Sequence, residues 1–158
     1  MRPEILFPLF APVRTLPGVG PRSVEKFARI AGERVIDLLW LRPNGYVDRR
    51  LRPSIAAVPE GTIGTVEVNV LSHIKPARPK APYRVLCGDE ASVLELIFFG
   101  GAQDYLARSL PEGARRILSG RIERHEGRLQ MAHPDYVVAP DQADQIPEIE
   151  PVYPLTEG

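Results

Sequence analysis

Cysteine, long apolar runs and targeting signals are scarce or missing in this sequence of 158 residues, and each absence excludes a class of protein. The single cysteine, Cys87, rules out a disulfide framework and a cysteine-rich zinc site, and we expect it to be a core residue in a reducing compartment. No apolar run approaches the roughly 20 residues of a membrane-spanning helix, and the proline-interrupted start lacks a signal-peptide pattern. We therefore expect a cytoplasmic protein that makes no membrane contact.

Motifs of catalysis are missing as well. The sequence contains no GxxxxGK[ST] phosphate loop, no HExxH or CxxC motif and no GxSxG nucleophile motif. His73, His125 and His133 are far apart, which favours local hydrogen bonding over a shared metal site. Asp89 and Glu90 directly follow a glycine, which is typical of a turn. We expect no catalytic residue, no metal and no cofactor in this chain, which by itself should not turn over a substrate.

Charge is balanced in total but unevenly distributed, with 20 basic and 20 acidic residues. Residues 1–59 contain ten Lys and Arg against five Asp and Glu, residues 60–140 contain ten of each, and residues 141–158 contain five acids and no base. A polyanion should therefore meet the first two segments and avoid the third. The zero net charge argues against a simple nucleic-acid coat protein.

Composition and apolar spacing divide the chain into three segments, namely a helical extension and connection over residues 1–59, a β-rich domain over residues 60–140, and an acidic, proline-rich linker over residues 141–158. The spacing predicts short helices at residues 23–31 and 34–41, each bounded by proline or glycine. We expect residues 44–59 to form an extended, largely irregular connection. The tail has no core pattern.

Five stretches of the central segment are rich in β-branched and aliphatic residues, and they predict strands at residues 62–73, 83–87, 93–99, 114–124 and 128–139. A helical pattern at residues 102–110 lies between the third and fourth strands. This order is that of an OB-fold, a five-stranded Greek-key barrel whose second and third strands usually form the ligand face. The predicted fold is therefore mainly β, with a short N-terminal addition that resembles a helix-hairpin-helix.

The hairpin LPGVGP at residues 16–21 precedes the first expected helix. Gly18 and Gly20 permit a tight turn, and the free amides at the start of a helix favour an anion. The hairpin could therefore hold a phosphate, with Arg22 and Lys26 beside it. Upstream prolines oppose the preceding helix that a full motif needs, so a packing element without a ligand is an equal alternative.

A basic loop at residues 73–84 joins the first two expected strands, and its cations are Lys75, Arg78, Lys80 and Arg84. It contains no acid, and three prolines stiffen it. Positive charge attracts nucleic-acid phosphates, and a stiff loop loses less entropy on binding. We predict that this loop binds the backbone of a nucleic acid, the alternative being a solvated loop. Arg124 and Arg128 flank the opposite loop and would close the same mouth, although nearby acids could pair with them.

Two phenylalanines stand at the end of the third expected strand. Alternation puts Phe98 on the face of Leu94, which we assign to the core. It puts Phe99 on the face of Glu95, which we expect to be more hydrated. An exposed aromatic ring beside the basic loop could stack on a base, a contact that contributes roughly 1–3 kcal/mol. Ordinary core packing is the alternative for Phe99.

Five strings taken in order resemble the N-terminal wedge region of the RecG ATP-dependent DNA helicases, namely LPGVGPRSVEKFARIAGERVIDLLWLRPNGYVDR, TVEVNVLSH, LELIFFG, ILSGRIERHEGRLQMAHPDYVV and PVYPLTEG. The resemblance runs over residues 16–158. It implies an OB-fold that binds replication forks and Holliday junctions and splits their strands. It also implies motor domains, absent here, that use ATP and Mg²⁺ to regress forks and migrate branches in DNA repair and recombination.

Carried over residue by residue, the family's stacking role falls on Phe99, with Phe98 as the second candidate. The family often has an asparagine after this pair and a tyrosine a few residues later, whereas here two glycines follow and Tyr105 comes further along. The role of Tyr105 therefore stays open.

The resemblance predicts a monomer that binds branched DNA and the single strand at its junction. Two other functions remain open. One is a free-standing single-stranded DNA-binding module. The other is a protein-interaction module that docks a single-strand-binding protein.

Overall fold

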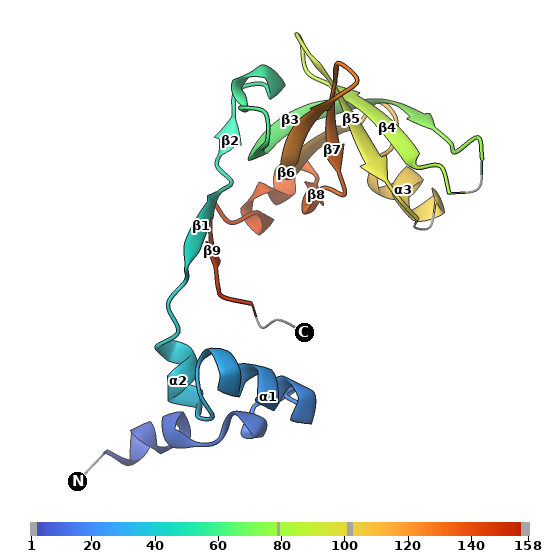
Figure 1. Ribbon diagram of the computed structural model, residues 1–158. Coiled ribbons are helices and arrows are strands. Elements are labelled where there is room, and N and C mark those ends of the chain that lie inside the picture. Colours follow the sequence, from blue (N-terminus) through green and yellow to red (C-terminus); the bar gives the residue numbers. More distant parts are fainter. Residues whose placement is uncertain (1–2, 79, 101–102, 156–158) are drawn as a thin grey trace. The chain divides into compact units, whose positions relative to one another are not determined.

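The computed structural model describes residues 3–78, 80–100 and 103–155 (Figure 1). The chain divides into two compact units: a larger one, Val47–Glu150, and a smaller one formed by the segments on either side of it. In the described residues, no helix has both the length and the apolar character needed to cross a membrane.

The smaller unit contains two 3₁₀ helices, Glu4–Phe10 and Val13–Thr15, and two α-helices, α1 (Pro21–Ile30) and α2 (Val35–Leu39). Both predicted helices are confirmed, with ends shifted by up to two residues. Helix α1 begins at a proline because the fixed φ of proline suits the first helical position, where no amide donor is needed.

The segment before α1 is tied to the start of α2. Val13 is fully buried, and its amide donates to Glu33 O at 2.8 Å. In return, the Val35 amide donates to Ala11 O at 3.0 Å. The amide of Arg34, the residue that precedes α2, donates to the Asp37 carboxylate at 2.9 Å and so caps the helix.

The larger unit is built around a closed barrel. The strands and helix are β1 (Gly45–Asp48), β2 (Leu51–Arg52), β3 (Thr62–Ile74), β4 (Tyr83–Gly88), β5 (Val93–Phe98), α3 (Gln103–Ser109), β6 (Arg115–His125), β7 (Arg128–Ala132), β8 (Tyr136–Val138) and β9 (Ile149–Val152). Strand β3 pairs with β4 and β6, β4 pairs with β5, and β7 pairs with β5 and β6, so the five strands form a ring. Only the pairing of β5 with β7 is parallel among these. The predicted mainly β OB-fold is confirmed.

The last predicted strand is wrong in one respect, because residues 128–139 form two strands rather than one. His133 has a left-handed backbone with φ of 45°, and the next residue, Pro134, has no amide to donate. The chain therefore turns after β7, and β8 pairs with β6 alone.

The barrel core is made of aliphatic side chains that alternate along the strands, and its fully buried members include Val66, Val85, Leu94, Leu96 and Leu118. Cys87 is also fully buried, as predicted. Each such side chain stabilises the fold by about 1.5–3 kcal/mol. Leu106 of α3 joins the same core.

The connection before the barrel is more ordered than predicted. Residues 44–59 contain β1, β2 and a 3₁₀ helix, Ile55–Ala57. Ile55 and Val58 are buried in the barrel core. A Cβ at Gly64 would lie 2.4 Å from Val58 Cγ1, so the close approach of this connection to β3 requires glycine.

The tail also departs from the prediction, because part of it packs. A 3₁₀ helix, Pro140–Gln145, precedes Ile146, which is buried in a second apolar cluster with Ile117 and Val138. Strand β9 then forms a two-stranded sheet with β1. A single buried isoleucine between acids and prolines leaves no periodic pattern, which is why the sequence did not indicate it.

A buried ionic network joins the start and the end of the larger unit. Arg49 is 6% exposed, and its Nη1 donates to Ser119 Oγ and to Asp135 Oδ2, at 2.9 Å each. Its Nε donates to Glu150 Oε2 at 2.6 Å, and its guanidinium lies 5.0 Å from the centre of the Tyr136 ring. Burial alone would lower the pKa of Arg49, but the hydrogen bonds to Glu150 and Asp135 raise it above its usual value. The guanidinium therefore stays charged inside the protein.

Candidate nucleic-acid interface

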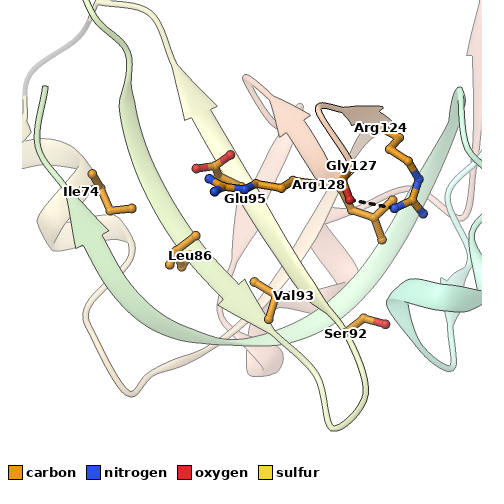
Figure 2. Close-up of a pocket in the computed structure, with 9 residues that line it drawn as sticks. Ile74, Leu86, Ser92, Val93, Glu95, Arg124, Gly127 and Arg128 are labelled. Carbon is orange, nitrogen blue, oxygen red and sulfur yellow. Dashed lines mark hydrogen bonds between the residues drawn. The ribbon is translucent and has the colours of Figure 1, made fainter.

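The outer face of β4, β5 and β7, which we call the binding face, carries two hollows. The first has a volume of about 620 Å³ and is lined by Ile74, Leu86, Val93, Leu129, Glu95 and Arg128, among others (Figure 2). The second, of about 440 Å³, is lined by residues that include Arg84, Ile97, Phe99, His125 and Gln130. Arg124 borders both hollows. These strands are the second, third and fifth of the barrel, and the second and third are the usual ligand face of an OB-fold.

Glu95 lies in the middle of the binding face, and our expectation that its side of β5 is hydrated was wrong. Glu95 is 2% exposed, because neighbouring long side chains cover it. Arg84 Nη1 lies 3.4 Å from one carboxylate oxygen, and Gln130 Nε2 donates to the other at 2.7 Å. Figure 2 shows the Arg128 side chain pointing toward the same carboxylate. A buried carboxylate is stable only when hydrogen bonds or ion pairs satisfy its oxygens. The Glu95 carboxylate in turn fixes the Arg84 and Gln130 side chains on the binding face.

The two phenylalanines are placed differently. Phe98 ends β5, is half-buried and packs against the barrel core. Phe99 follows the strand, is 61% exposed and borders the second hollow. Tyr105 is 63% exposed on α3 and lines neither hollow. Phe99 therefore places an exposed aromatic ring at the edge of the second hollow.

A residue that sequence reasoning did not connect with this site, His133, contacts both phenylalanines. The Phe99 amide donates to His133 Nε2 at 3.1 Å. The imidazole centre lies 5.9 Å from the Phe99 ring and 6.0 Å from the Phe98 ring. Nothing in the local sequence indicates this contact, because 34 residues separate His133 from Phe99.

The basic loop connects β3 and β4 at one end of the binding face. Its cations Lys75, Arg78 and Lys80 are exposed, and none of the three forms a salt bridge within the part of the chain that the structure describes. Arg84 is directed instead onto the face, where it pairs with Glu95. An anion that reached these three side chains would not first have to break an ion pair with any residue that the structure describes.

His73 and Tyr83 anchor the two ends of the basic loop. His73 Nε2 lies 2.7 Å from Leu110 O, and because a carbonyl only accepts, this nitrogen carries the proton. His73 Nδ1 lies 2.8 Å from the Tyr83 hydroxyl. Burial, with a smaller contribution from the charge of Glu112, raises the pKa of Tyr83, so the phenol stays protonated.

The opposite loop is a tight turn in which Glu126 and Gly127 both have positive φ. Arg124 donates to Gly127 O at 3.0 Å (Figure 2). It also pairs with Glu60, with Nε and Nη2 each 2.7 Å from Oε1. Arg128 is exposed and lines the first hollow. To bind a phosphate, Arg124 would therefore have to break its ion pair with Glu60. Arg128 has no such ion pair among the residues that the structure describes.

The hairpin before α1 belongs to the smaller unit. Gly18 has a φ of 80°, and the Val19 amide donates to Leu16 O at 3.2 Å, which is a type II turn with proline and glycine at its centre. The amides of Ser23 and Val24 both donate to Gly20 O. Arg22 and Lys26 are exposed beside it. Because Pro21 has no amide and the Ser23 amide already donates to Gly20 O, fewer donors face a phosphate than the hypothesis of a phosphate hairpin assumes.

No three His, Cys, Asp or Glu side chains are grouped as metal ligands among the residues that the structure describes. Burial raises the pKa of the Cys87 thiol to about 12, which disfavours the thiolate form in the folded protein.

Comparison with known proteins gives one consistent family. The model of the RecG wedge domain matches residues 12–158. The ATP-dependent DNA helicase RecG of Pasteurella multocida is 33% identical over 157 residues, and that of Escherichia coli K12 is 32% identical over 151 residues. Each match covers 93% of this chain and 21% of the relative, so the chain spans about one fifth of the length of these curated relatives.

A solved structure of RecG bound to a three-way DNA junction shares the fold. It matches with a TM-score of 0.71 at 21% sequence identity, over 94% of this chain and 20% of that chain.

Proposed function

The chain belongs to the RecG wedge domain family, and on this premise we propose that it binds branched DNA as the wedge of a RecG-like helicase. In this role it recognises a fork or junction by shape, charge and base stacking. Sequence-specific recognition is not expected, because the binding face is a curved sheet rather than a helix that could enter the major groove.

The observation that carries the proposal is the exposed ring of Phe99 at the edge of a hollow bordered by arginines. Where two strands of a duplex part, one base pair after another loses its stacking partner, at a cost of a few kcal/mol for each step. A ring that stacks on the freed base returns roughly 1–3 kcal/mol of this cost. Phe99 thereby favours the open junction over the closed duplex.

The cations of the binding face supply the part of the affinity that is the same for branched, duplex and single-stranded DNA. The basic loop has three unpaired cations, and Arg84, Arg124 and Arg128 lie along the face behind it. They attract phosphates of duplex and single strand alike. Affinity then comes from charge, and the preference for a branch comes from the aromatic ring.

The relatives are ATP-dependent DNA helicases about five times the length of this chain, and one RecG structure contains a three-way DNA junction. We propose that this wedge acts with motor domains that use ATP and Mg²⁺ to regress forks and migrate Holliday junctions in repair and recombination. We further propose a cytoplasmic monomer, with a single-strand-binding protein as an additional partner.

The test is binding of the 158-residue chain to a three-way fork, a matched duplex and a matched single strand at two salt concentrations. Phe99→Ala should remove most of the fork preference. Tyr46→Ala is the matched control, because Tyr46 is 68% exposed and lines neither hollow. Equal losses on fork and duplex with Phe99→Ala would contradict a wedge. No preference of the unmodified chain for the fork over the linear single strand would favour a single-stranded DNA-binding module. No binding at low salt would favour a module that docks a protein partner.

A further inference from the structure

The corner that follows β7 ends the backbone pairing between β7 and β5. In this parallel pair, Ile97 is the partner of Ala132. The His133 amide donates to Ile97 O at 2.9 Å, and then φ of 45° at His133 turns the chain away, with Pro134 next. Beyond Ile97 the edge of β5 therefore has no further strand partner on this side, just where Phe98 and Phe99 begin.

The His133 side chain takes over where the backbone pairing stops. Its Nε2 accepts the Phe99 amide at 3.1 Å, so this nitrogen carries no proton. Its ring is tilted by 32° from the Phe99 ring and stands at 83° to the Phe98 ring. One imidazole thus fixes the backbone of Phe99 and contacts both aromatic rings.

Phe99 needs such support because it lies past the end of its strand and precedes a glycine. It lies outside β5, and the next residue is Gly100 with φ of 72°. An exposed ring on an unsupported corner would have to be ordered when it binds, and that ordering weakens the affinity. A ring that is already held in place binds without this loss.

We infer that His133 is a positioning residue that orders Phe99 for stacking at the branch. The inference rests on the proposed function, and it assigns His133 no contact with DNA. His133 acts through the amide and ring of Phe99, so its contribution exists only while the Phe99 ring is present.

The experiment compares three substitutions at His133 in the 158-residue chain. His133→Gly suits the left-handed backbone and keeps the amide bond to Ile97, but removes the imidazole. His133→Asn also tolerates this backbone, and its side chain is too short to replace Nε2, so it serves as the second variant if the glycine variant fails to fold. His133→Gln carries an acceptor of similar reach and should restore the contact.

We expect His133→Gly and His133→Asn to weaken fork binding by roughly 2- to 10-fold, the range of one neutral hydrogen bond, with duplex binding unchanged. His133→Gln should bind the fork nearly as well as the unmodified chain. In a Phe99→Ala background, His133→Gly should cause no further loss, because residues that act through one another are not additive. The fluorescence of 2-aminopurine placed at the branch reports base stacking, and it should rank the variants in the same order as their fork binding.

Two results would overturn the inference, and they are distinguishable. If Phe99→Ala weakens fork binding but His133→Gly has the same effect with and without the Phe99 ring, His133 does not act through Phe99. If Phe99→Ala itself leaves fork binding unchanged, the proposed wedge function fails, and the positioning role fails with it.

Discussion

Removing Arg49 should destabilise the barrel strongly, and Arg49→Met is the substitution that tests it. The side chain is 6% exposed and makes hydrogen bonds to Ser119, Asp135 and Glu150. Hydrogen bonds to charged groups contribute about 1.5–3 kcal/mol each, and breaking a fully buried ion pair costs about 3–5 kcal/mol.

The expected loss of stability is smaller than the cost of breaking a fully buried ion pair, because two of the partners of Arg49 are partly exposed. Asp135 and Glu150 are 47% and 34% exposed, so water can replace the guanidinium at both carboxylates. Ser119 is fully buried but still accepts a hydrogen bond from Thr65 at 2.9 Å. Methionine also refills much of the apolar volume. We therefore expect a loss of about 2–3 kcal/mol in the free energy of unfolding, at the upper end of the roughly 0.5–3 kcal/mol that most destabilising substitutions cost.

Urea unfolding followed by far-UV circular dichroism measures this loss. Trp40 fluorescence is unsuitable because Trp40 lies in the smaller unit. With a slope of about 1–3 kcal/mol per molar urea, a loss of about 2–3 kcal/mol should lower the midpoint by about 0.7–3 M. The matched control is Arg50→Met, because Arg50 is 60% exposed, pairs with Asp48 at the surface and should leave the midpoint nearly unchanged. An Arg49→Met midpoint equal to that of the control would refute the claim that the network holds the tail to the barrel.

Three further predictions follow from the basic loop, Cys87 and Asp89. Replacing the three unpaired cations of the basic loop by glutamine should weaken binding to every form of DNA and reduce the salt slope on duplex by up to about 2.7, and an unchanged slope would exclude the loop from the contact. Because burial raises its pKa to about 12, Cys87 should react with a thiol reagent only as fast as the barrel unfolds, which a comparison with and without urea would show; rapid reaction in the native state would contradict it. Burial alone would raise the pKa of Asp89, but hydrogen bonds from four backbone amides, those of Ile55, Ala91, Ser92 and Asp89 itself, together lower it below 3.8. Its contribution to stability is therefore complete above pH 3.8 and is lost as the pH falls through the lower folded value. Urea unfolding at pH 7 and pH 3 should show a smaller pH effect in Asp89→Asn than in the unmodified chain, and equal effects would contradict this.

The barrel was predictable because its order is encoded locally. Alternating residues such as Val66, Val68 and Val70 mark a strand without knowledge of its partner, and glycines mark where strands end. The positions of Cys87 in the core and of Phe98 and Phe99 on different sides follow from the same period of two.

Features that depend on distant partners were not predictable. Glu95 has the polar character of a solvent-facing residue, yet it is buried because Gln130 and Arg84 cover it, and Gln130 lies 35 residues away in sequence. The burial of Arg49 requires Glu150, 101 residues away. A charged residue in a sequence is predicted to be exposed to solvent unless its partner is known. Only the folded structure shows which distant residue that partner is.

The candidate site shows the same division. Alternation separated Phe99 from the core face of Phe98, but it placed Phe99 on the face of Glu95, which is buried rather than hydrated, and Phe99 is exposed because it lies just past the end of β5. His133 entered the sequence reasoning only as one of three scattered histidines. Its role depends on the break between β7 and β8, where Pro134 and a left-handed residue interrupt what looked like one strand. A proline inside a predicted strand was the available signal for that break.

The most direct test of the account is the ratio of fork affinity to duplex affinity, measured at one ionic strength for the unmodified chain and for Phe99→Ala. Stacking of roughly 1–3 kcal/mol predicts that the substitution lowers this ratio by about 5- to 150-fold while duplex affinity stays constant. A ratio that is the same in both proteins would show that Phe99 does not hold the branch open and would contradict the central claim.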